Sequence, residues 1–172
     1  MKRIAILGPE STGKTALAQS LASYYNSPWI PEYARQYVEQ LDRPYTYEDV
    51  ENIARHQIAE VSEYETKFRE KKILFLDTEL IITKIWFLHV YQKCPDFLLT
   101  ALQESSVDLY LLCQPDIPWE YDPVRENGNL RDYFYEWYKK EIIALNKPFV
   151  EINGLGDVRL QNAIQSIDAL NL

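Results

Sequence analysis

The stretch that decides the fold of this chain starts at the eighth residue and reads Gly8-Pro9-Glu10-Ser11-Thr12-Gly13-Lys14-Thr15. It fits the pattern G-x-x-x-x-G-K-S/T at every fixed position. The apolar run Lys2–Leu7 precedes it and predicts a buried strand, and apolar residues at helical spacing follow it from about Lys14 to Tyr25. A glycine-rich turn between a strand and a helix is the arrangement in which this pattern cradles phosphate, so the sequence predicts a P-loop.

The residue types in this loop suit the phosphate tail of ATP. Glycines permit backbone conformations that are closed to other residues, so consecutive N–H groups can point inward at phosphate oxygens. Lys14 is expected to reach the β- and γ-phosphates, and Thr15 is expected to hold Mg²⁺. The residues expected to bind the nucleotide are Gly8, Glu10, Ser11, Thr12, Gly13, Lys14, Thr15 and Ala16.

Apolar runs and helical periodicities alternate along the rest of the chain. Further strands are expected at about 28–32, 72–77, 107–113 and 149–152, and helices at about 33–41, 47–71, 78–90, 130–145 and 158–170. Thr46, with Asp49 three residues on, predicts a capping box at the start of the longest helix. Five strands alternating with helices predict an α/β fold, a P-loop NTPase with a doubly wound five-stranded parallel sheet and helices on both faces. By its resemblance to P-loop folds of the nucleoside-kinase kind, the strand order is expected to be 2-3-1-4-5.

Length and composition indicate one globular unit. With 172 residues, of which 47% are hydrophobic, residues 1–172 are expected to form a single P-loop domain. The segment at about 114–131 is polar and punctuated by prolines, and a loop of that length inside a domain is typical of a functional lid.

The charge and the absence of apolar segments limit the partners. A formal net charge of −8 would repel a nucleic-acid backbone, whereas a small anionic ligand needs only a few local donors. The sequence has no run of 18 apolar residues and no apolar signal core before the first strand, so we expect a cytoplasmic protein without a membrane partner. Cys94 and Cys113 are expected to be core thiols, and the oligomeric state stays open.

Two acidic residues at strand ends are candidates for the chemistry. Glu32 follows the second strand and is a candidate general base toward a substrate hydroxyl; the alternative is a solvated helix-start glutamate, which Arg35 could pair with. Asp77 ends the third strand, where an acid commonly holds Mg²⁺ or its water shell, although it could lie nearer the acceptor or cap a helix starting at Thr78. The sequence does not decide which of the two acids is the base.

Arginines in the expected lid and aromatics near Glu32 complete the candidate site. Arg125 and Arg131 are expected to swing onto the transferring phosphoryl group, and the alternative for each is a surface ion pair. Trp29 and Tyr33 flank Glu32 and are preferred over Trp86 for stacking on a substrate ring, against the alternative of core packing.

Taken in order, these motifs resemble the ribosylnicotinamide kinase domain of the bacterial NAD-biosynthesis protein NadR. The residues that carry the resemblance are the glycine loop, Pro31-Glu32-Tyr33-Ala34-Arg35, Phe75-Leu76-Asp77-Thr78-Glu79 and Gln114-Pro115-Asp116-Ile117-Pro118-Trp119. The resemblance spans nearly the whole chain and implies ATP-dependent phosphorylation of the 5'-hydroxyl of nicotinamide riboside, giving nicotinamide mononucleotide for NAD salvage. It implies ATP and Mg²⁺ as ligands, Glu32 and Asp77 near the ribose and the metal, and a substrate site that includes Arg35. The adenylyltransferase and helix-turn-helix domains of complete NadR are not expected here.

Two other functions stay open at the level of sequence. A deoxynucleoside kinase or another nucleoside kinase would use a similar strand-end glutamate. A nucleotide-dependent regulatory ATPase is the alternative from a different class, although a GTPase switch fits poorly because Asn146-Lys147 is not followed by the aspartate of the guanine signature.

Overall fold

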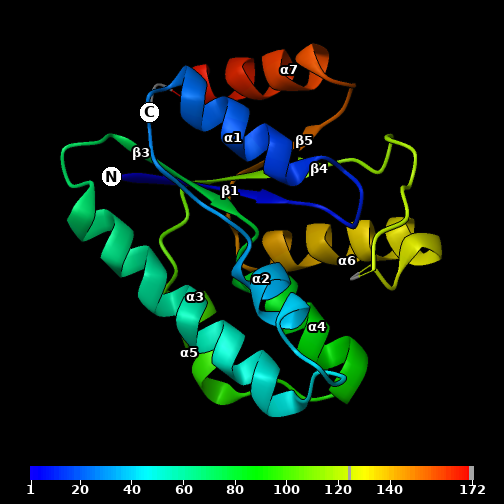
Figure 1. Ribbon diagram of the computed structural model, residues 1–172. Coiled ribbons are helices and arrows are strands. Elements are labelled where there is room, and N and C mark those ends of the chain that lie inside the picture. The colour runs from blue at the N-terminus through cyan, green and yellow to red at the C-terminus, as the bar shows by residue number, and fades with distance from the viewer. Residues whose placement is uncertain (124, 171–172) are drawn as a thin grey trace.

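The computed structural model describes residues 1–123 and 125–170, which fold around a five-stranded sheet (Figure 1). The strands are β1 (Lys2–Leu7), β2 (Trp29–Ile30), β3 (Ile73–Asp77), β4 (Leu109–Cys113) and β5 (Phe149–Ile152). They lie in the order β2-β3-β1-β4-β5, and each neighbouring pair is parallel. The predicted α/β class and strand order are therefore confirmed.

Helices connect the strands and cover both faces of the sheet. They are α1 (Lys14–Tyr24), α2 (Tyr33–Glu39), α3 (Tyr47–Lys67), α4 (Leu80–Tyr91), α5 (Asp96–Glu104), the 3-10 helix η1 (Gly128–Leu130), α6 (Arg131–Ala144) and α7 (Asp157–Asp168). Figure 1 shows α1 and α7 on one face and α3, α4, α5 and α6 on the other. A separate buried apolar cluster fills the space between the sheet and each helix layer. Within the described residues, no helix combines the length and the apolar character that crossing a membrane requires.

The structure corrects the sequence analysis between β3 and β4. Helix α5 was not predicted, because its nine residues are shorter than the stretch over which a helical period is recognised. Helix α4 begins at Leu80 and not at Thr78, which has a left-handed φ of 72°. The alternative role of Asp77 as the cap of this helix is wrong, because Glu79 is the N-cap and its carboxylate accepts the Ile81 N–H at 3.1 Å.

Other boundaries differ by a few residues. Helix α3 ends at Lys67 instead of near 71, and β2 has only two residues. The predicted capping box is confirmed, because the Thr46 hydroxyl accepts the Asp49 N–H while the Asp49 carboxylate accepts the Thr46 N–H.

The parallel sheet brings the loops that contain the predicted site residues to one edge. The carboxyl ends of parallel strands face the same side, so the segments that follow β1, β2, β3, β4 and β5 meet there. These segments begin at Gly8, Pro31, Thr78, Gln114 and Asn153, and Glu32 is the second residue of its segment.

Candidate active site

The glycine loop, residues 8–15, depends on its two glycines. Gly8 and Gly13 have φ angles of 152° and 72°, which side-chain-bearing residues rarely adopt. A Cβ at Gly8 would lie 2.8 Å from the Cys113 carbonyl oxygen, and one at Gly13 would lie 3.2 Å from the Ile117 side chain. Gly13 is also the N-cap of α1, so the first N–H groups of this helix, which have no partner within the helix, lie beside the loop.

Lys14, Thr15 and Asp77 come together where β1 and β3 end. The Lys14 ammonium donates to the Pro9 carbonyl oxygen at 2.9 Å, so the lysine lies back over the loop. The Thr15 hydroxyl donates to Asp77 Oδ2 at 2.6 Å. Asp77 is 2% exposed, and its second oxygen, Oδ1, is buried without a hydrogen-bond partner among the described residues.

These oxygens fit a magnesium ion. Mg²⁺ prefers hard oxygen ligands such as carboxylate and hydroxyl groups, and here a buried carboxylate oxygen with no partner in the described part of the chain lies beside a threonine hydroxyl. Burial raises the pKa of Asp77, while the Thr15 hydroxyl and the Lys14 charge lower it. A cation at this position would offset the cost of the buried negative charge.

Glu32 stands at the N-terminus of α2 and lines the same cavity as the glycine loop. Burial raises the pKa of Glu32, and Asp77 adds to this, whereas the charges of Lys14 and Arg35 oppose it. Arg35 pairs with Glu39 at 2.9 Å and with Asp122 at 2.6 Å, and not with Glu32 as the sequence allowed. The Glu32 carboxylate is therefore placed at the cavity with a pKa closer to neutrality, as a proton acceptor requires.

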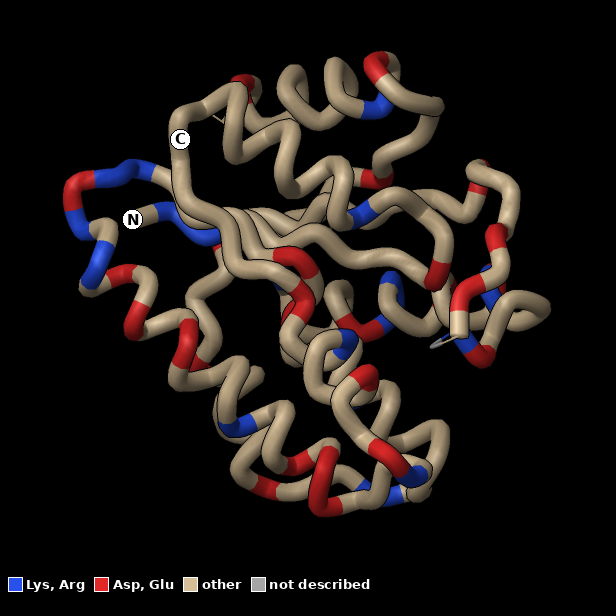
Figure 2. Tube along the Cα trace, in the orientation of Figure 1, with Lys and Arg blue, Asp and Glu red and all other residues tan. Residues whose placement is uncertain are grey.

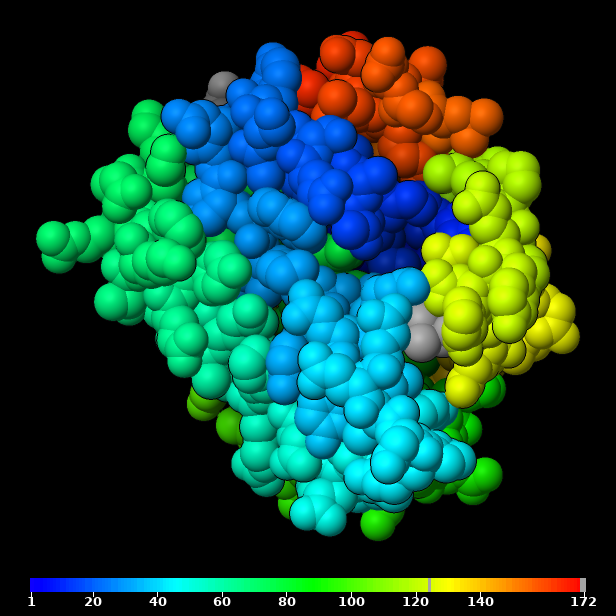
Figure 3. Space-filling model, viewed as in Figure 1, coloured from blue at the N-terminus to red at the C-terminus, as the bar shows by residue number. Residues whose placement is uncertain are grey.

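The cavity has a volume of about 560 Å³ and opens between the glycine loop, α2 and the segment that follows β4. Figure 3 shows this hollow between the dark blue glycine loop and the yellow-green segment. One wall is aromatic and comes from residues far apart in the sequence: Tyr45, Trp86, Phe134 and Tyr138. The rings of Tyr45 and Trp86 pack edge to face, with centroids 4.8 Å apart. A flat apolar ring would find packing partners on this wall.

The residues expected to stack on a substrate lie elsewhere. Trp29 packs against the core on the α1 and α7 face of the sheet, and Tyr33 stacks on His56 with ring centroids 3.6 Å apart. Neither is among the described residues that line the cavity, whereas Trp86, the less favoured candidate, is. The geometry therefore shifts the ring-stacking prediction from Trp29 and Tyr33 to Trp86.

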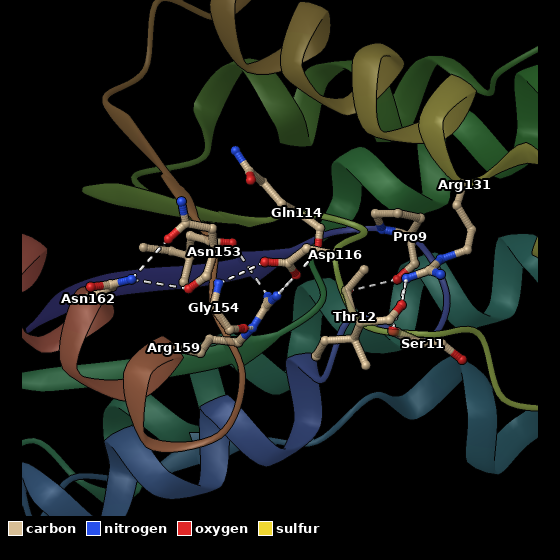
Figure 4. Close-up of polar contacts among 12 residues, drawn as sticks. Pro9, Ser11, Thr12, Gln114, Asp116, Arg131, Asn153, Gly154, Arg159 and Asn162 are labelled. Atoms are coloured by element: carbon tan, nitrogen blue, oxygen red, sulfur yellow. Dashed lines mark hydrogen bonds and ion pairs between the residues drawn. The ribbon is translucent and has the colours of Figure 1, made fainter.

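The two predicted arginines of the lid segment, about residues 114–131, make different contacts. Arg131 contacts the glycine loop, whereas Arg125 contacts the lid segment itself. Arg131 donates to the carbonyl oxygens of Ser11 at 3.1 Å and Ile117 at 2.7 Å (Figure 4). Arg125 donates to the Glu120 carbonyl oxygen at 2.7 Å and lines the cavity. Both guanidinium groups thus contact main-chain oxygens; Arg125 faces the cavity, while Arg131 ties the lid segment to the loop.

A buried cation on the β5 side was not predicted. Arg159, in the first turn of α7, is 3% exposed and forms an ion pair with Asp116 across 43 residues of sequence (Figure 4). The other Asp116 oxygen accepts the Gly154 N–H at 2.7 Å, and Arg159 donates to the Gly154 carbonyl oxygen at 2.8 Å. This pair ties the loop after β4 to the loop after β5, and no spacing or motif in the sequence marks Arg159.

Charge is distributed differently on the surface and in the cavity. Figure 2 shows acidic residues along α3 and in the lid segment, with Lys and Arg interspersed, in keeping with the net charge of −8. Among the described residues, the cavity wall combines the cations Lys14, Arg35 and Arg125 with the acids Glu10, Glu32 and Glu126, so it is less acidic than the protein as a whole. These local cations suit a small anionic ligand in a protein that is acidic as a whole.

Comparison with known proteins gives the family. A family model described as an AAA domain matches residues 3–159. The chain belongs to this family. The trifunctional NAD biosynthesis/regulator protein NadR of Escherichia coli (strain K12) is 28% identical over 165 residues, which cover 94% of this chain and 38% of that protein. The chain therefore spans little more than a third of the length of this relative.

Solved structures share the fold. A NadR protein in complex with NR superposes with a TM-score of 0.82 at 23% identity, covering 96% of this chain and 50% of that one. A deoxyadenosine kinase from M. mycoides, with the products dCMP and dCDP, superposes with a TM-score of 0.63 at 12% identity, covering 97% of this chain and 99% of that one. The resemblance to NadR that the sequence motifs indicated is thereby confirmed.

Proposed function

We propose that the chain is a kinase that transfers the γ-phosphoryl group of ATP to the 5'-hydroxyl of nicotinamide riboside, giving nicotinamide mononucleotide. The observation that carries the proposal is the composition of one cavity of about 560 Å³, which places the glycine loop and Glu32 opposite an aromatic wall. The similarity to NadR, a protein of NAD biosynthesis with a structure in complex with NR, supports the choice of acceptor.

The glycine loop supplies the donor side of the reaction. Its N–H groups and the N-terminus of α1 bind the phosphates, and Lys14 moves from the Pro9 carbonyl to the β- and γ-phosphates. Thr15 and Asp77 would hold Mg²⁺, which when bound offsets the negative charge of the phosphates. Arg125 faces the same cavity and stabilises the charge that the phosphoryl group carries in the transition state.

Glu32 acts on the acceptor side. Its carboxylate accepts the proton of the 5'-hydroxyl as this oxygen forms its bond to the γ-phosphorus. The bond between the γ-phosphorus and the bridging oxygen breaks at the same time, and ADP leaves with that electron pair. Asp77, with its metal role, stays the alternative base if Glu32 proves dispensable.

The aromatic wall suits the base of this acceptor. The pyridinium ring of nicotinamide riboside is flat and positively charged, so it gains both stacking and cation–π stabilisation from Trp86 and Tyr45. Neutral nucleobases gain only the stacking. The wall therefore favours nicotinamide riboside over neutral nucleosides.

The proposal includes the organisation of the chain. Residues 1–172 act as a single kinase domain, and the lid segment closes over the phosphates, as its contacts with the glycine loop support. A cytoplasmic location, where ATP and magnesium are available, goes with this activity. A deoxynucleoside kinase is the second candidate, because the deoxyadenosine kinase of M. mycoides matches the chain over 97% of its length.

The test is acceptor-dependent release of ADP from MgATP with nicotinamide riboside and a panel of nucleosides and deoxynucleosides. We expect nicotinamide riboside to give the highest kcat/KM, and Lys14→Ala to abolish turnover while the exposed control Lys140→Ala keeps it. Faster turnover of a deoxynucleoside would favour the second candidate. ATP hydrolysis that no acceptor stimulates would instead favour a regulatory ATPase and end the kinase proposal.

A further inference from the structure

Glu10, inside the glycine loop, makes contacts that phosphate binding does not explain. Its Oε1 atom accepts the main-chain N–H groups of Glu126 at 2.9 Å and Asn127 at 3.2 Å, and its Oε2 accepts the Asn127 N–H at 3.2 Å. The two amides belong to the lid segment, 116 and 117 residues away in the sequence. A carboxylate therefore holds a strip of lid main chain against the loop.

A carboxylate is an unfavourable group to place beside phosphates, because the like charges repel each other. The phosphate-binding donors of such a loop are main-chain N–H groups and a lysine, and neither role can be filled by an acid. The glycine-loop motif predicts that Glu10 contacts ATP, but the Glu10 oxygens accept main-chain N–H groups of the lid segment. The role of Glu10 therefore lies in its contact with the lid segment.

The strip that Glu10 holds contains the residues that face the reacting groups. Arg125 directly precedes it and lines the cavity. The Glu126 carboxylate accepts the hydroxyl of Tyr45, which belongs to the aromatic wall, at 3.1 Å. A second tie lies beside it, because Ser11 Oγ accepts the Glu120 N–H at 3.1 Å, and Glu120 is the residue whose carbonyl oxygen receives Arg125.

We propose that Glu10 is a positioning residue that latches the lid segment at residues 126 and 127 and thereby holds Arg125 over the phosphoryl group. The proposal rests on the kinase function proposed above. It assigns one acidic side chain of the glycine loop to the lid, and it makes closure of the lid depend on the same loop that binds the donor phosphates.

The latch predicts a division between kcat and KM. Removing it leaves the main-chain donors of the loop and Lys14 in place, so ATP still binds. Arg125 is then no longer held where charge develops, so the loss falls on kcat. Hydrogen bonds to charged groups are strong enough that we expect Glu10→Ala to lower kcat about 10-fold or more, with KM for ATP changed less than about 3-fold. Glu10→Gln keeps one acceptor oxygen and should recover part of this loss.

A measurement on the unliganded full chain tests the latch directly. Residue-resolved amide hydrogen exchange should show the Glu126 and Asn127 amides exchanging about 10-fold faster or more in Glu10→Ala, and less so in Glu10→Gln. The Asp49 amide, which the Thr46 hydroxyl holds, is the internal control and should not change. Glu48→Ala, which removes an exposed acid of α3, is the matched variant and should alter neither exchange nor kcat.

Two results overturn the proposal. Unchanged exchange at residues 126 and 127 in Glu10→Ala would show that there is no latch, and an unchanged kcat would show that the latch does not position the catalytic arginine. Because exchange is measured without ATP or acceptor, it is independent of the kinase assignment. Wild-type protein that transfers no phosphate would instead refute the proposed function, and with it the catalytic part of the latch.

Discussion

Asp77→Asn separates the stability of the fold from binding at the proposed metal site. The substitution keeps the size of the side chain and a carbonyl oxygen that can accept the Thr15 hydroxyl, now bonded at 2.6 Å. It removes the charge of a side chain that is 2% exposed and whose pKa burial raises. A buried polar atom without a partner costs about 1–3 kcal/mol, and more when it is charged. We expect the unliganded variant to gain about 1 kcal/mol, which corresponds to roughly 2–4 °C in Tm for a chain of this size.

Binding of MgATP should change in the opposite direction. At 100 times its Kd, a ligand stabilises the folded state by about 2.7 kcal/mol, or roughly 5–11 °C in Tm. If loss of the Asp77 carboxylate weakens MgATP binding about 100-fold, the same concentration gives about 0.4 kcal/mol, or roughly 1–2 °C. The variant should therefore melt above wild type alone and below it with MgATP.

Differential scanning calorimetry with and without MgATP measures both effects. The matched control is Glu79→Gln, because Glu79 is also buried but accepts the Ile81 N–H at 3.1 Å and the Tyr110 hydroxyl at 3.4 Å. We expect this control to lower Tm and to keep the MgATP shift. An Asp77→Asn protein that kept the full shift would refute the metal-site reasoning. One that unfolded below wild type without ligand would refute the argument that the charge is costly.

Three further predictions address the acceptor site and the fold. Because burial raises the pKa of Glu32, kcat/KM should rise with pH, and the rise should occur at a higher pH than the pKa of an ordinary glutamate would give. In a pH–rate profile, Glu32→Gln should lack this rise and should lower kcat about 10²–10⁴-fold. Trp86→Ala should raise KM for nicotinamide riboside roughly 2- to 30-fold, whereas Trp29→Ala should lower Tm without changing that KM. Equal effects of the two variants on KM would contradict the assignment of Trp86, and not Trp29, to the aromatic wall. Thr46→Ala removes the hydroxyl of the capping box and should lower the free energy of unfolding by about 1 kcal/mol in a urea titration with kcat retained; an unchanged midpoint would show that the cap is dispensable.

Strong local patterns explain why most of the fold could be predicted from the sequence. Buried parallel strands are continuous apolar runs, and β4 and the part of β3 before Asp77 have this character. The glycine loop marks the end of the first strand and indicates the edge of the sheet at which the nucleotide is expected to bind. Helix α5 was missed because it is only nine residues long, shorter than the stretch over which a helical period is recognised.

The acids of the site were predictable, but its aromatic wall was not. Asp77 is the last residue of β3 and Glu32 lies two residues after β2, so the topology alone brings them to one edge. Whether an aromatic ring faces that edge depends on which side of the sheet it points to. Strand β2 has only two residues, Trp29 and Ile30, which pack on opposite faces, and so short a strand gives no alternation from which to assign them.

The same limit applies to the contacts of the lid. Glu10 meets residues 126 and 127, and Arg159 meets Asp116, through pairings that exist only once the sheet has formed. A motif indicates what a loop binds when its side chains act locally. It cannot indicate that one of those side chains turns away to a distant segment.

The tripeptide Asp77-Thr78-Glu79, which begins with the last residue of β3, shows how neighbouring acids acquire different roles. Asp77 and Glu79 are both buried, and burial raises the pKa of each. Glu79 is satisfied within the protein by the N–H of Ile81 and nearby hydroxyls, so it builds the start of α4. Among the described residues, Asp77 keeps one oxygen without a partner next to Thr15, so its charge is not fully satisfied there. Thr78 lies between the two acids with a φ of 72°, which a β-branched residue rarely adopts. On one side of this turn Asp77 accepts the Thr15 hydroxyl of the glycine loop, and on the other side Glu79 accepts the Ile81 N–H at the start of α4.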